Sequence, residues 1–141
     1  MAGYVATARV EIEASPERVW EVLLDPVATK EFMFGADLET DWKVGSPITW
    51  SGEYEGKAYQ DKGEVLEVEP GRLLKVTHYS PLGGQPDVPE NYHTLTYELS
   101  GDSPTSLSLS QDNNASEEEA EHARGMWEML VQGVKKVAES G

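Results

Sequence analysis

The chain has 141 residues, 38% of them hydrophobic, and its 4 Trp and 6 Tyr supply enough apolar surface to bury a core. Its 26 acidic residues against 11 basic ones give a formal net charge of -15, which repels phosphate backbones and anionic lipid headgroups and so argues against nucleic-acid and membrane-surface partners. The absence of cysteine excludes disulfides and thiolate metal sites.

The chain begins like a strand. In Tyr4–Glu13, Ala8, Val10 and Ile12 share one side and charged residues occupy the other, which predicts a half-buried strand. The segment lacks the apolar core of a signal peptide, and no apolar run approaches the roughly 20 residues of a membrane span. We therefore expect a cytoplasmic protein without stable membrane insertion, and one domain covering residues 1–141.

Two helix starts follow in quick succession. Ser15-Pro16-Glu17 offers a hydroxyl N-cap, proline at the first helical position and an acid near the positive end of the helix dipole. Asp25-Pro26 then repeats the signal. The pattern predicts two short helices in a row.

Strand-like segments and one long helix complete the chain. The strands are expected at about Asp37–Asp41, Pro47–Glu53, Ala58–Val68, Leu73–Tyr79, Tyr92–Leu99 and Ser106–Asp112. Ser116 and Glu119 form a capping box, after which apolar residues recur at spacings of three and four. The predicted stripe comprises Ala123, Met126, Trp127, Leu130, Val134, Val137 and Ala138.

This order predicts an α+β fold. No crossover helix separates the later strands, so the sheet is expected to be antiparallel. A curved sheet wrapped around the long C-terminal helix buries both apolar faces, which leaves the two short helices to close one end.

Five segments carry a resemblance to a known family. They are SPERVWEVLLDP (15–26), DWKVGSPITW (41–50), GEVLEVEPGRLL (63–74), YHTLTYEL (92–99) and MWEMLVQGVKKVAE (126–139). In this order they resemble the START-like, helix-grip superfamily, also called SRPBCC. Within it, they are similar to the group named after the C-terminal domain of the activator of heat-shock protein 90 ATPase. Family members often carry tryptophan after the second short helix, where this chain has Phe32-Met33-Phe34.

The resemblance implies a helix-grip fold with a cavity between sheet and C-terminal helix that holds small apolar or amphipathic molecules. Known members include lipid carriers, hormone receptors, aromatic polyketide cyclases and the co-chaperone itself. The co-chaperone has an additional N-terminal domain for which this chain has no room, so its ATPase-activating role is not carried over. Fold alone does not decide among these functions.

Two histidines stand out among the candidate binding residues. If Tyr79 faces Tyr92 across a hairpin, His78 faces His93 on the side expected to face the long helix. Together with Tyr97, Trp50 and Trp127 they offer polar and aromatic groups to a cavity, and the alternative is a pair of hydrogen-bonded strand residues near the rim.

The remaining candidates come from the helices. Phe32 and Phe34 are expected near the cavity mouth, and Met126, Trp127 and Leu130 can line it from the long helix or simply pack in the core. Acidic residues in the strands are interpreted as a solvated outer face; they are Glu53, Glu55, Asp61, Glu64 and Glu67.

The leading hypothesis is a small-molecule binding protein with no cofactor and no metal, since two histidines without a carboxylate on their face make an incomplete site. The second is a cyclase, dehydratase or isomerase using His78 or His93 as acid or base and Tyr97 as a donor, although no catalytic motif is present. The third is a chaperone-associated module that presents an acidic surface to a basic partner. Ligand identity and the choice between monomer and homodimer stay open.

Overall fold

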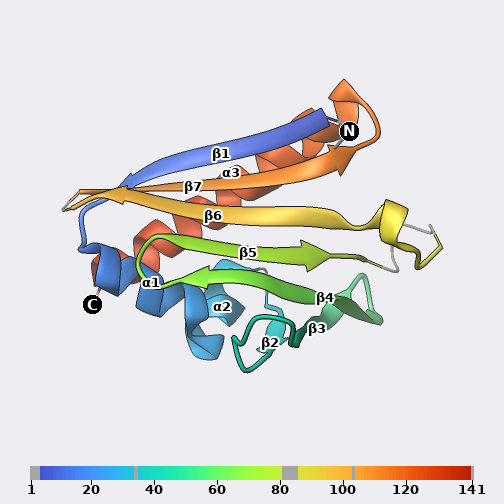
Figure 1. Ribbon diagram of the computed structural model, residues 1–141, viewed down its shortest axis with the longest axis horizontal. Helices are drawn as coiled ribbons and strands as arrows, with labels where there is room; N and C mark the ends of the chain where they lie inside the picture. Colours follow the sequence, from blue (N-terminus) through green and yellow to red (C-terminus); the bar gives the residue numbers. More distant parts are fainter. Residues whose placement is uncertain (1–3, 34, 81–85, 103, 141) are drawn as a thin grey trace.

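The computed structural model describes residues 4–33, 35–80, 86–102 and 104–140. Within them, seven strands form one antiparallel sheet in the order β1-β7-β6-β5-β4-β3-β2 (Figure 1). The elements are β1 (Tyr4–Ile12), α1 (Pro16–Leu24), α2 (Pro26–Phe32), β2 (Asp37–Glu39), β3 (Pro47–Tyr54), β4 (Lys57–Glu69), β5 (Leu73–His78), a 3-10 turn η2 (Pro89–Asn91), β6 (His93–Gly101), β7 (Thr105–Asn114) and α3 (Glu117–Ser140). Each predicted strand and helix is present, with ends that differ by a few residues.

The double helix start is confirmed, and one residue explains it. The Ser15 hydroxyl accepts a hydrogen bond from the Arg18 N–H at 3.2 Å, which caps α1. Asp25 ends α1 in an extended conformation, and its carboxylate accepts from the Val27 N–H at 2.9 Å to cap α2. Because Asp25 serves both helices, the chain turns between them without a loop.

The long helix α3 crosses one face of the sheet and packs mainly against β1 (Figure 1). Its buried residues are Ala120, Ala123, Trp127, Leu130, Val131, Val134 and Ala138. The prediction that Met126 belongs to this stripe is wrong, since its side chain is exposed. At 3.6 residues per turn, Met126 lies about 100° around the helix from Trp127, whereas Val131 lies close to it and takes the place in the core.

The helix start at Ser116 differs in one detail from the predicted capping box. The Glu119 N–H donates to the Ser116 hydroxyl at 3.1 Å as expected. The Glu119 carboxylate, however, accepts from the N–H of Ala115, one residue before the N-cap position. In the usual capping box this carboxylate accepts from the N–H of the N-cap residue itself, so the second hydrogen bond is shifted by one residue.

The two short helices are fastened to the C-terminal half of α3. From α1, the Arg18 guanidinium donates to the carbonyls of Ala138 at 3.3 Å and Val137 at 3.2 Å, in the last turn of α3. From α2, Phe32 lies directly over Gly133, where an added Cβ would stand 2.8 Å from the Phe32 Cβ. The short helices thus close one end of the layer between sheet and α3, as predicted.

Candidate functional site

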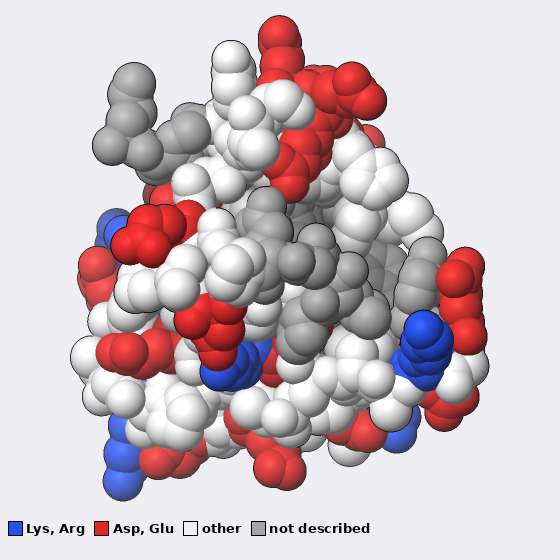
Figure 2. All heavy atoms as spheres, turned by 90° about the vertical axis from the view of Figure 1, so that its right-hand side faces the viewer, with Lys and Arg blue, Asp and Glu red and all other residues white. Residues whose placement is uncertain are grey.

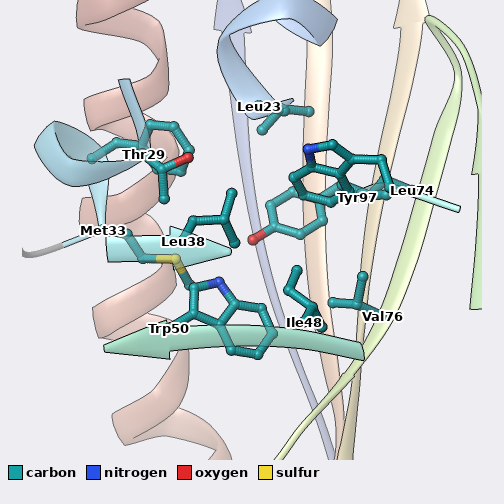
Figure 3. Close-up of a pocket in the computed structure, with 11 residues that line it drawn as sticks. Leu23, Thr29, Met33, Leu38, Ile48, Trp50, Leu74, Val76 and Tyr97 are labelled. Carbon is teal, nitrogen blue, oxygen red and sulfur yellow. The ribbon is translucent and has the colours of Figure 1, made fainter. Parts of the chain in front are cut away.

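A small cavity lies between the two short helices and the middle of the sheet (Figure 3). Its volume is about 20 Å³, enough for roughly one water molecule. The lining residues are Leu23, Thr29, Phe32, Met33, Leu38, Trp42, Ile48, Trp50, Leu74, Val76 and Tyr97. Among the described residues the lining comes from α1, α2, β2, β3, β5, β6 and the segment after β2, so the cavity lies beside α3 rather than against it.

Tyr97 supplies a polar group to this apolar space. Its ring is buried, and Figure 3 shows the hydroxyl pointing toward Leu38 within the ring of lining residues. Burial raises the pKa of Tyr97 far above its usual value, so the phenol stays protonated. A phenol hydroxyl can both donate and accept a hydrogen bond, so Tyr97 offers a polar contact to a molecule in the cavity.

The outer wall of the cavity is built by Leu38 of β2 and by Trp42, which follows that strand. Trp42 has a left-handed backbone conformation, with φ of 60°, and its indole N–H donates to the Leu24 carbonyl at 3.2 Å. β2 is a three-residue edge strand paired only with β3. Sequence reasoning placed Leu38 in a strand without assigning it to the cavity, and it missed Trp42, whose position depends on a left-handed backbone conformation.

A largely buried, hydrogen-bonded pair of side chains lies next to the cavity. His78 Nε2 donates to Asp61 Oδ2 at 2.9 Å, and their side chains are only 12% and 15% exposed. The Trp50 ring, which lines the cavity, meets the His78 ring edge-on at 5.1 Å between centroids. The interpretation of Asp61 as part of the solvated outer face is therefore wrong, whereas Glu53, Glu55, Glu64 and Glu67 are exposed as expected.

The sequence does contain a signal for the position of Asp61. Glu55 and Gly56 have φ of 50° and 80° and form a two-residue turn between β3 and β4. This turn fixes the hairpin register so that Asp61 pairs with Trp50, on the same face. Recognising Glu55-Gly56 as a tight hairpin turn would have placed the carboxylate inside.

The predicted histidine register is confirmed. His78 pairs with His93, and the Tyr79 and Tyr92 rings stack at 5.2 Å on the opposite face. The two histidines nevertheless have different partners: His93 Nδ1 donates to the Asp112 carbonyl at 2.8 Å, within the sheet, whereas His78 meets a carboxylate.

The other candidates lie in several places. Phe32, Trp50 and Tyr97 line the cavity; Trp127 and Leu130 are buried in the core under α3 and do not line it. Met126 faces outward, and Phe34 lies outside the described residues. A ligand-binding role for any of these residues stays a prediction.

The described residues contain neither a metal-binding cluster nor a membrane-spanning helix. Across residues 4–33, 35–80, 86–102 and 104–140, no three His, Asp or Glu side chains gather as metal ligands would. No helix in the same ranges is long and apolar enough to span a membrane.

Comparison with known proteins identifies the family. The model of the family described as "Activator of Hsp90 ATPase homolog 1-like protein" matches residues 13–139. The chain belongs to this family. A search of curated proteins gives no match.

Solved structures agree with this Hsp90-activator-like assignment. ChR145 from Cytophaga hutchinsonii is 42% identical, with coverage of 99% of this chain and 97% of that one and a TM-score of 0.85. The Aha1 dimer from Colwellia psychrerythraea is 19% identical over 96% of each chain, with a TM-score of 0.72. DynU16, described as a putative protein in the dynemicin biosynthetic locus, is 20% identical over 97% of this chain and 48% of its own, with a TM-score of 0.79. The last two show that the helix-grip fold is shared.

Proposed function

We propose that this protein binds a small, largely apolar molecule in the cavity beneath α1 and α2, with Tyr97 as a hydrogen-bonding anchor. The observation that supports this most directly is the cavity itself, which is lined by apolar and aromatic side chains and by the buried Tyr97, whose hydroxyl points into the ring of lining residues. A pocket that is mostly apolar with a few placed polar groups is typical of small-molecule sites, and a hydrogen bond to Tyr97 would orient the bound molecule.

The ligand enters by displacing the outer wall. Ligand pockets usually measure about 300 Å³ or more, far above the roughly 20 Å³ of the closed cavity. We expect the wall made by β2 and Trp42 to move, because β2 is a short edge strand and the left-handed backbone of Trp42 is strained for a residue other than glycine. Its displacement opens the space between Trp50 and Tyr97.

Titration with N-phenyl-1-naphthylamine, a neutral fluorescent probe, tests the proposal. We expect saturable binding, and Trp50→Leu should weaken it by about threefold to tenfold because an aromatic wall is lost. Trp20→Leu is the matched control, since Trp20 also packs against the core but does not line the cavity. Absence of saturable binding, or equal weakening in both variants, would contradict the proposal.

A second candidate is a protein-interaction module, with a chaperone as one partner of suitable chemistry. Figure 2 shows Asp and Glu spread widely over the end of the molecule that lies to the right in Figure 1, and the formal net charge is -15. Such a surface favours a basic partner. A pull-down with a chaperone middle domain at low and high salt tests it, and absence of a complex at low salt would exclude it.

A further inference from the structure

The contact between Asp61 and His78 indicates the chemical class of the ligand, an inference that rests on the function proposed above. Two atoms of the pair, Asp61 Oδ1 and His78 Nδ1, are buried and have no hydrogen-bond partner among the described residues. Buried polar groups in folded proteins are almost always paired, so two such atoms in one hydrogen-bonded pair call for a functional explanation.

The local backbone is built to bring this pair together. Between the paired residues Lys62–Tyr79 and Val65–Val76, Gly63 lies across from His78. A Cβ on Gly63 would stand 1.8 Å from the Thr77 carbonyl oxygen, so only glycine allows β5 to approach β4 this closely. The approach places the His78 ring against the carboxylate of Asp61, which lies two positions before Gly63 on β4 and therefore on the same face.

Hydrogen-bond chemistry indicates which nitrogen carries the proton when the imidazole is neutral. An ionised carboxylate only accepts hydrogen bonds, so the proton shared with Asp61 belongs to His78 Nε2. In the neutral ring, Nδ1 therefore carries a lone pair and no proton. Both unpartnered atoms, Asp61 Oδ1 and His78 Nδ1, are acceptors that require a donor from a bound molecule.

The neighbouring charges select the sign of that molecule. When His78 is neutral, the pair carries the single negative charge of Asp61. Burial and the Asp61 charge raise the pKa of Tyr59, so that phenol is neutral, and His93 across the strand donates to a backbone carbonyl. An anionic ligand is repelled at this position, and a neutral or cationic donor is accepted.

Trp50 connects this pair to the cavity. Its ring both lines the cavity and contacts His78, so a ligand that shifts Trp50 brings its polar end to the imidazole. We propose that Asp61 and His78 form the polar subsite of the binding cavity and that the ligand is an aromatic molecule whose hydroxyl donates to His78 Nδ1. The ring lies against Trp50, and Asp61 holds the imidazole as an acceptor.

Three naphthalene compounds test this subsite. In the wild-type protein, 2-naphthol should bind about fivefold or more tightly than 2-methoxynaphthalene, which has the same ring but no donor. The anionic 2-naphthoate should bind about tenfold or more weakly than 2-naphthol. His78→Phe should reduce the preference for 2-naphthol to about one while leaving the affinity for 2-methoxynaphthalene within about twofold.

His93→Phe is the matched control, because His93 pairs with His78 in the sheet yet donates to a backbone carbonyl. It should keep the preference for 2-naphthol. A readout that needs no substitution is the ¹⁵N spectrum of the histidine rings: the proposed subsite requires a proton on Nε2 of His78 and none on Nδ1, and 2-naphthol should shift the Nδ1 signal.

The outcomes separate this inference from the proposed function. Equal binding of 2-naphthol and 2-methoxynaphthalene would leave the binding function standing and overturn the subsite. A preference that survives His78→Phe, or a proton found on Nδ1 of His78 in the free protein, would also overturn it. If none of the naphthalenes binds, the proposed function itself fails and the subsite fails with it.

Discussion

The contact between Gly133 and Phe32 gives a sharp prediction about stability. An alanine Cβ at position 133 would stand 2.8 Å from the Cβ and 3.1 Å from the Cα of Phe32. Non-bonded carbons prefer about 3.5–4.0 Å. Because the contacted atoms belong to the base of the Phe32 side chain, a change of rotamer cannot relieve the overlap, and α2 must move away from α3.

The magnitude follows from two opposing terms. Alanine stabilises a helix interior by about 1 kcal/mol relative to glycine. Overpacking in a buried contact costs about 1–3 kcal/mol. Gly133→Ala should therefore be neutral or destabilising by up to about 2 kcal/mol, although the helix propensity alone would favour it.

Gly125→Ala is the matched control in the same helix, because no atom lies within 4 Å of an added Cβ there. It should gain the full propensity of about 1 kcal/mol. Since both variants share the propensity term, their difference in unfolding free energy, about 1–3 kcal/mol, measures the α2–α3 contact.

Urea denaturation followed by circular dichroism measures that difference directly. In thermal melts, 1 kcal/mol corresponds to about 4 °C for a chain of this length. Equal stabilisation by the two alanines would show that α2 does not pack on Gly133, and the closed cavity wall at Phe32 would then have to be reconsidered.

Three further predictions concern the contacts that hold the elements together. Arg18→Ala should lower the unfolding free energy by about 1–2 kcal/mol, because two carbonyls at the end of α3 lose their hydrogen-bond donor. Arg18→Lys should recover part of this loss. Equal urea midpoints for the wild-type protein and Arg18→Ala would contradict the prediction. Gly63→Ala should cost about 3 kcal/mol or prevent folding, as the added methyl overlaps a main-chain oxygen; a wild-type melting temperature would refute the described strand approach. The Glu139 carboxylate accepts hydrogen bonds from Lys135 and from the Glu13 N–H, and these contacts lower its pKa from 4.5. Its contribution to the free energy of unfolding is therefore complete above pH 4.5 and is lost as the pH falls through the lower pKa of the folded state. Glu139→Gln should therefore flatten the acid side of the stability–pH curve, and unchanged curves would exclude this role.

Most of the fold could be predicted from the sequence because local signals agree with the global arrangement. Ser15 and Asp25 start two helices by capping their N-termini, a local effect that needs no tertiary information. The strands alternate apolar and polar residues wherever one face is buried, and this fixed the pairing of His78 with His93. These predictions depended on neighbours along the chain or on a simple hairpin.

The errors occurred where the local sequence pattern does not determine the tertiary position of a residue. Met126 satisfies a spacing of three and four, yet such spacing admits residues at the edge of a helix face as well as at its centre. Asp61 lies on an inner face that is polar at this end of the sheet, so hydropathy could not distinguish the two sides of β4. The position of Trp42 depends on a left-handed backbone residue that no periodic pattern reveals.

Two sets of acidic groups affect a ligand: the exposed carboxylates of the surface and the largely buried carboxylate of Asp61. The surface carries most of the charge of -15, and salt at about 0.15 M screens such exposed charges beyond roughly 8 Å. The Asp61 carboxylate is only 15% exposed, so salt screens its field far less. A discrimination against anions that persists at high salt must therefore come from the buried pair rather than from the surface. The two contributions act in the same direction, so the proposed site is expected to favour a neutral or cationic aromatic donor over an anion.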